Sequence, residues 1–292
     1  MTGVIRKSVG MMFVILLALP SLTFAADDRR PDTISGILQS SSLSKTEKTE
    51  VQGKAVAAIN AGVPAEDVEI IVSRSIRRGA DAATINRFLD TSISMRQQGL
   101  PVAPVLDRIE QGLSKGVPPE RIAVAAQQLA SKITVAQPIV DDLIRGGVKP
   151  RQRNERETAI EATARALEKS IPAEDLKKMG ASVRERKGSL PLFISAANTA
   201  AYFAGSGMSS MTSSHLVQNA VEKGYTERDL DGMVKQITNQ MRRGTRAEEA
   251  AHQMEREGMQ GGRGMEQDMG GRGGMGPGSS TGGAGGMGGH RK

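Results

Sequence analysis

The chain has 292 residues, 38% hydrophobic and 24% charged, and this balance supports a packed core and excludes a chain that is disordered throughout. Only 2% of the residues are aromatic, which argues against an aromatic-rich β-sandwich and against sites that stack bases or sugars. The formal charge is +7 and cysteine is absent, so disulfides, thiolate metal sites and cysteine nucleophiles are excluded.

The first 26 residues have the pattern of a secretory signal peptide. Arg6 and Lys7 precede an apolar run from residue 11 to 19, and small residues follow at Ala25 and Ala26. An apolar run of that length forms a helix of about 14 Å, too short to cross a bilayer core of about 30 Å. We therefore expect cleavage after Ala25 or Ala26 and a periplasmic or secreted protein without a transmembrane helix in its mature form.

Glycines at regular spacing organise the middle of the chain. Successive intervals are 17, 20 and 17 residues in the first set, and 17 and 20 in the second. A glycine is favoured just past the end of a helix, because it adopts the left-handed conformation without steric cost. The spacing predicts helix pairs of about 37 residues, near the short end of HEAT-type repeats. The glycines are Gly62, Gly79, Gly99 and Gly116, then Gly207, Gly224 and Gly244.

Apolar residues keep a constant offset from these glycines. Val68, Val72 and Ile76 match Val105, Ile109 and Leu113, which lie 37 residues later. Start signals agree with these helices: Ser44 with Glu47, and Thr245 with Glu248, have the spacing of capping boxes. The turns Gly-Val-Pro-Ala-Glu (62–66) and Gly-Val-Pro-Pro-Glu (116–120) place proline and glutamate at helix starts. Alternating strand patterns are missing.

These Gly-Val-Pro turns resemble those of uncharacterised exported bacterial α-helical-repeat proteins. The resemblance covers little more than the turns, implies the fold and carries no activity. Together with the periodicity it predicts an all-α protein, an α-solenoid-like stack of about ten helices built from 37-residue helix pairs.

Residues 137–187 break the regular spacing, because Gly207 follows Gly62 by 145 residues, which is not a multiple of 37. Either one repeat is degenerate, or this segment is a hinge between an N-terminal and a C-terminal helical lobe. Of these alternatives, we slightly favour the hinge. We therefore divide the chain into a signal peptide (1–26), a flexible leader (27–43), an N-terminal repeat lobe (44–136), an irregular or hinge segment (137–187), a C-terminal repeat lobe (188–257) and a disordered Gly/Met-rich tail (258–292).

The search for catalytic chemistry finds no constellation. His215 lacks a nucleophile elbow and His252 lies on an exposed helix pattern, and no zinc spacing occurs. Glu227, Asp229 and Asp231 mimic the start of a calcium loop, but an apolar helical stripe continues through them, so a helix explains them better. We expect neither a catalytic residue nor a cofactor.

The tail contains sixteen of the 34 glycines and five spaced methionines. Its composition predicts a flexible segment. The alternative is a soft-metal trap, because thioether sulfur suits Cu(I) and copper is handled in the periplasm. The candidate ligands are Met259, Met265, Met269, Met275 and Met287.

Signal and tail carry +2 each, so about +3 of the +7 remains on the helical part, which with export argues against a nucleic-acid partner. Helical repeats present extended curved surfaces. We expect a non-enzymatic scaffold that binds a protein or peptide, with periplasmic copper handling as the alternative. An enzyme that uses scattered acids stays open as a third reading.

Overall fold

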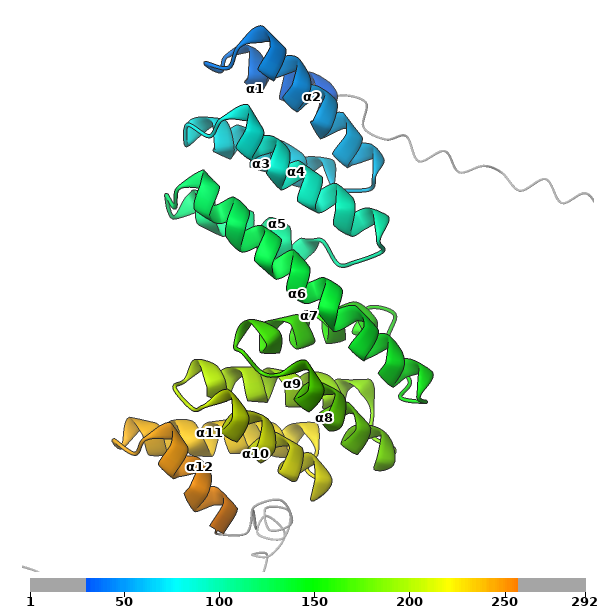
Figure 1. Cartoon of the computed structure of the whole chain (residues 1–292), viewed down its shortest axis with the longest axis vertical. Coiled ribbons are helices and arrows are strands. Elements are labelled where there is room, and N and C mark those ends of the chain that lie inside the picture. Colours follow the sequence, from blue (N-terminus) through cyan, green and yellow to red (C-terminus); the bar gives the residue numbers. More distant parts are fainter. Residues whose placement is uncertain (1–29, 257–292) are drawn as a thin grey trace, which may run out of the picture.

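The computed structural model describes residues 30–256, and this part of the chain forms twelve α-helices and no strand (Figure 1). The predicted all-α class is confirmed. The helices are α1 (Arg30–Gln39), α2 (Lys45–Asn60), α3 (Ala65–Arg77), α4 (Ala82–Gln97), α5 (Ala103–Ser114), α6 (Pro119–Arg145), α7 (Glu155–Glu168), α8 (Ala173–Glu185), α9 (Leu190–Gly205), α10 (Ser210–Glu222), α11 (Glu227–Arg242) and α12 (Ala247–Arg256).

The helices stack in two layers along one axis, as a solenoid does (Figure 1). The even-numbered helices pack side by side from α2 to α12, and the odd-numbered helices form the other layer. One continuous hydrophobic core lies between the layers. Among residues 30–256, no helix is long and apolar enough to span a membrane.

The predicted helix ends are confirmed at all seven glycines, each of which has a positive φ. At Gly62 the backbone N–H of the following residue, Val63, donates to the carbonyl of Ala58 at 3.0 Å, the Schellman pattern. Val63 is buried, so the turn also seals the core. Within residues 30–256, three further positions have positive φ: Gly147, Ser170 and Lys187.

The apolar stripes face the core as predicted, with two exceptions at their margins. Val68 and Val72 are fully buried, as are Val105 and Ile109 in the next pair. Ile76 and Val234 are only partly buried and pack at the edge of the core.

The N-terminal signals are confirmed at one helix and wrong at another. Ser44 and Glu47 form a capping box at α2. Glu248 instead accepts a hydrogen bond from the backbone N–H of Ser209, the N-cap of α10, at 2.6 Å. The carboxylate of Glu248, which the sequence pattern assigns to Thr245, therefore binds the backbone of a residue that is distant in the sequence.

Helix α6 explains the break in the spacing. Gly62-Val-Pro and Gly99-Leu-Pro separate one helix from the next, and 37 residues after Gly99 the chain has Ala136-Gln-Pro. Alanine does not favour the left-handed turn, and α6 runs through Ala136 and Pro138 to Arg145, a helix of 27 residues. Two elements of the repeat are thus joined into one helix.

After α6, one interval between turn positions is shorter than 37 residues, and the next interval is regular again. Ser170 ends α7 with a positive φ, 34 residues after Ala136, and Gly207 follows 37 residues later. The interval from Gly62 to Gly207 is therefore three residues short of four full repeats. The degenerate repeat that we considered accounts for the irregular number.

Because one turn is absent at α6, the long and the short helices of the repeat lie in opposite layers before and after this helix. The longer repeat helices, of 16 residues, are α2 and α4 in the even layer but α9 and α11 in the odd layer. The shorter ones, of 12 or 13 residues, are α3 and α5 in the odd layer but α8 and α10 in the even layer.

Two arginines, Arg78 and Arg186, make the same contact in the two halves, which agrees with the equivalence of the short helices α3 and α8. Arg78 follows α3 and donates to the carbonyls of Leu113 and Ser114 at the end of α5, at 2.8 and 3.0 Å. Arg186 follows α8 and donates to the carbonyls that end α10, those of Val221 and Glu222. The same contact links neighbouring short helices on both sides of α6.

Two segment boundaries differ from the prediction. Residues 30–39 belong to the predicted flexible leader but form α1, whose Ile34 and Leu38 are buried. The segment 137–187 contains the end of α6 and all of α7 and α8, so it is largely helical. Whether it acts as a hinge stays a prediction.

Candidate functional site

A groove of about 800 Å³ lies on the odd-layer face of the second half, across α7, α9 and α11. Its floor is α9, whose outward residues Ile194, Asn198 and Tyr202 all line the groove. Helix α7 supplies Thr158 on one side, and α11 supplies Val234 on the other.

Helix α9 makes a neutral floor because of its composition. None of its sixteen residues is charged. Ser189 caps its start by accepting a hydrogen bond from the backbone N–H of Leu192. Its inward side is fully buried at Phe193 and Ala197, so the fold places a hydrogen-bonding but uncharged surface in the groove.

Neighbouring helices hold the polar side chains of the floor. Arg165 of α7 donates to Oδ1 of Asn198 at 2.7 Å, which orients the carboxamide and leaves its Nδ2 group as a donor. The hydroxyl of Tyr202 is 2.9 Å from that of Thr238 on α11. Ordered side chains lose little conformational entropy when a ligand binds.

The rim of the groove is acidic on a basic protein. Three carboxylates line it against one guanidinium, that of Arg151. Ser189 donates to Glu227 at 3.0 Å, whereas Asp231 is exposed. Glu155 is almost completely buried and accepts a hydrogen bond from the backbone N–H of Arg151. The remaining acids, on α11, place negative charge at one end of the groove.

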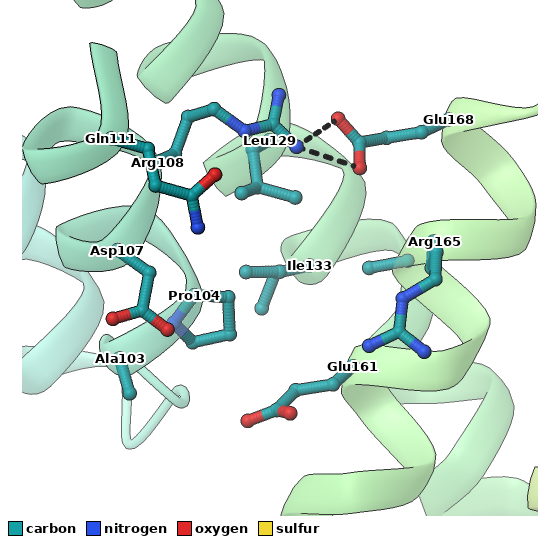
Figure 2. Close-up of a pocket in the computed structure, with 11 residues that line it drawn as sticks. Ala103, Pro104, Asp107, Arg108, Gln111, Leu129, Ile133, Glu161, Arg165 and Glu168 are labelled. Carbon is teal, nitrogen blue, oxygen red and sulfur yellow. Dashed lines mark hydrogen bonds and ion pairs between the residues drawn. The ribbon is translucent and has the colours of Figure 1, made fainter. Parts of the chain in front are cut away.

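A second hollow, of about 250 Å³, lies between α5 and α7, with α6 behind it (Figure 2). Arg108 of α5 pairs with Glu168 of α7 at 3.1 Å across its edge. Burial raises the pKa of Glu161 above its ordinary value, Arg165 opposes this, and the charges of Glu157 and Asp107 raise it further.

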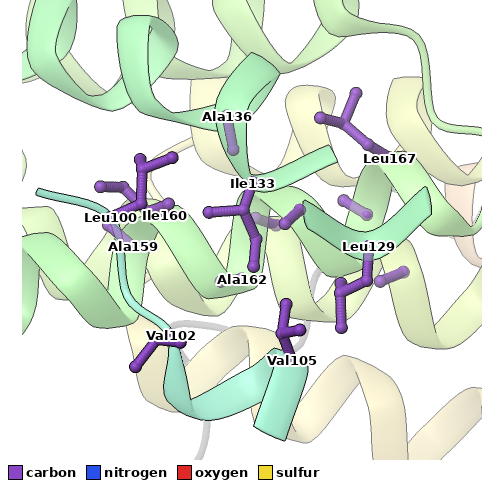
Figure 3. Packing of buried hydrophobic residues seen from close by; sticks show 14 of the residues in the cluster. Leu100, Val102, Val105, Leu129, Ile133, Ala136, Ala159, Ile160, Ala162 and Leu167 are labelled. Carbon is purple, nitrogen blue, oxygen red and sulfur yellow. The ribbon is translucent and has the colours of Figure 1, made fainter. Parts of the chain in front are cut away.

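The apolar back of this hollow belongs to the core. Leu129 and Ile133 of α6 line it and also join the buried cluster that includes Val105 and Ala162 (Figure 3). The hollow therefore has a rigid apolar base and a charged rim. Helix α7 contributes to both the hollow and the groove, so the two features adjoin on one face of the molecule.

The structure does not test the copper hypothesis. The five candidate methionines, Met259, Met265, Met269, Met275 and Met287, lie outside the described residues. His215 and His252 are exposed, and His252 is 3.6 Å from Glu255 one helical turn away. Within residues 30–256, no group of three His, Asp or Glu side chains could hold a metal ion.

The acidic run at Glu227 is the start of a helix, as predicted. Asp229 is the third helical residue of α11, and it forms a capping box with Thr226. The backbone N–H of Thr226 donates to Asp229 at 2.9 Å. These carboxylates serve the helix end and, through Glu227 and Asp231, the groove.

Sequence reasoning missed the groove, although one signal pointed to it. The stretch from Leu190 to Gly205 is free of charge, whereas the preceding helix, Ala173–Glu185, is rich in charge. No protein-family model matches the chain, and neither a curated protein nor a solved structure matches it.

Proposed function

We propose that this protein is an exported, non-enzymatic helical-repeat scaffold that binds an extended peptide segment of a partner protein. The observation that carries the proposal is the groove across α7, α9 and α11. Three consecutive helices of one layer form it, as expected for a surface that reads a segment several residues long.

The chemistry of the groove suits a peptide backbone. Asn198 offers a carboxamide donor, and Tyr202 and Thr158 offer hydroxyl groups beside the apolar carbons of Ile194. Such a surface satisfies backbone amides and carbonyls and covers small side chains, without demanding a charge at the centre.

The charges along the groove favour a particular order of charged and uncharged residues in the bound segment. Asp231 and Glu227 on α11 attract a lysine or arginine of the partner, whereas the floor on α9 favours uncharged residues. We therefore expect a segment with a neutral core of several residues flanked on one side by a basic residue.

A display library of extended peptides, selected on the full chain, tests this proposal. We expect enriched peptides with the neutral and basic pattern, and about tenfold weaker binding by Asn198→Ala and by Asp231→Asn. Asn219→Ala on α10 and Asp90→Asn on α4 are matched controls, because both residues are exposed outside the groove. Peptides that bind all four variants equally well would contradict the groove as the binding site.

A further inference from the structure

The hollow between α5 and α7 combines a charge imbalance with an apolar base. Three carboxylates and two guanidiniums line it, which leaves one negative charge. The carboxylates are Asp107, Glu161 and Glu168, and the guanidiniums are Arg108 and Arg165.

The five charged side chains on the rim differ in whether they have a hydrogen-bond or ion-pair partner. Arg108 is paired with Glu168, and Arg165 donates to Asn198. Asp107 and Glu161 form no hydrogen bond or ion pair with any residue between 30 and 256. They lie on opposite walls and both point into the hollow (Figure 2).

The positions of these two carboxylates define what would fit between them. A bound cation would balance the single excess charge, and it would sit over Leu129, Ile133 and Pro104. A volume of about 250 Å³ is far larger than one water molecule, whose share of liquid volume is about 30 Å³. The hollow can therefore hold a long side chain with a charged end.

We propose that this hollow is a binding site for an arginine side chain of the partner segment, which lays its methylenes on Leu129 and Ile133 and donates to Asp107 and Glu161. A planar guanidinium has donors on several edges, so it can reach carboxylates on two walls at once, which a compact ammonium does less well. The site rests on the proposed function, because it adjoins the peptide groove along α7.

The burial of Glu161 agrees with this assignment. Burial raises its pKa, Arg165 lowers it, and Glu157 and Asp107 raise it further, so Arg165 compensates only part of the cost of removing this carboxylate from water. A guanidinium beside it would restore the interaction that burial removes.

Nuclear magnetic resonance titration of the full chain with arginine amide tests the site without a peptide. We expect saturable shifts of amides near Asp107 and Glu161, with a dissociation constant in the range of about 1–10 mM for a single side chain. Lysine amide should bind several-fold more weakly, and norleucine amide, which keeps the α-amino group but lacks the side-chain charge, should not saturate.

Matched variants distinguish a direct contact with arginine amide from a general effect of negative charge on the protein. Asp107→Asn and Glu161→Gln should each weaken arginine amide about tenfold, whereas Glu157→Gln, one turn away on α7 and outside the hollow, should change it less than about twofold. Equal effects of all three variants, or shifts confined to other helices, would overturn the proposal. Since the probe is one amino acid, it reports on the hollow even when peptides fail to bind the groove.

Discussion

Ser170 and Lys187 have left-handed backbone conformations, with φ of 62° and 54°. They stand where other repeats have a glycine, and the residue after each closes the same turn: Ile171 donates to Ala166 at 3.1 Å and Gly188 to Val183 at 2.8 Å. A side chain in this conformation costs about 1–2 kcal/mol, part of which is offset because glycine loses more entropy on folding.

Replacing either residue by glycine should therefore stabilise the protein. We expect Ser170→Gly and Lys187→Gly each to raise the free energy of unfolding by about 0.5–1 kcal/mol, measured by denaturant unfolding. The reverse change at an equivalent turn, Gly207→Ser, should lower it by a similar amount, since Gly207 has a φ of 98°. A destabilised Ser170→Gly variant would show that the serine makes a contact which outweighs its backbone strain.

Glu161 gives the protein a pH-dependent stability. Because burial raises its pKa above 4.5, the folded state holds this proton to higher pH than the unfolded chain does. Stability from this group is thus highest at acid pH and falls as the pH rises from about 4.5 through the raised pKa. Glu161→Gln removes the penalty, so its melting temperature should exceed that of the natural protein at pH 7 and equal it near pH 4. A melting temperature of Glu161→Gln above that of the natural protein at both pH values would instead indicate that glutamine packs better.

At the scale of single elements, α6 decides the architecture. Its continuity depends on Ala136, which stands where the other pairs have glycine, and on a helix that tolerates Pro138. Proline removes one backbone donor and is unfavourable inside a helix, so we expect the turn around Pro138 to be the weakest point of α6.

The variant Ala136→Gly tests this weak point. We expect a loss of about 1 kcal/mol in unfolding free energy, with faster hydrogen exchange of the amides on both sides of Pro138. Ala126→Gly is the matched control, since Ala126 is equally buried in the same helix, and it should cost a similar amount without the local increase in exchange. Equal exchange in the two variants would mean that Pro138 does not weaken α6.

Limited proteolysis distinguishes a hinge from one continuous stack. Residues 146–154 connect α6 with α7, and Arg151 and Arg153 are exposed there. After trypsin has cut this loop, we expect the two fragments to elute together, because α6 packs against both α7 and α8 and Arg156 holds Asp141 at 2.7 Å. Two separate helical fragments would support the hinge.

At the scale of the whole molecule, the exchange of layers places equivalent helices on opposite faces. The long helices face one side in the first half and the other side in the second half. The groove lies on the long helices of the second half, beside the place where the odd layer passes from α5 to α7. The groove and the hollow therefore adjoin on one face near the place where the layers exchange.

Residues 258–292 can be tested as an independent part of the molecule. Their composition predicts that deleting them leaves the melting temperature and the helical content unchanged, as measured by circular dichroism. The same segment carries the copper alternative, so an anaerobic Cu(I) titration should compare the full chain with a variant in which Met259, Met265, Met269, Met275 and Met287 are leucine. We expect equal binding, and a clear excess for the natural chain would establish the metal function instead.

The sequence by itself determined the features that depend on neighbours along the chain. Helix ends follow from glycines such as Gly62, which adopt a positive φ, and the capping box at Ser44 needs only residues three apart. Buried stripes follow because Val68 and Val72 share one face of a helix. These are local physical constraints, and they are sufficient to predict an all-helical stack.

Only the tertiary structure decided the features that join distant segments. Alanine at 136 removes the glycine that favours a turn, but only the structure shows that α6 continues there between α4 and α8 and that the layers exchange. The groove and the hollow unite residues as far apart as Asp107 and Asp231, and Glu248 caps another helix because Ser209 lies beside it. Such contacts have no periodic signal in the sequence, since side chains from separate helices meet only after the core has fixed how the helices stack.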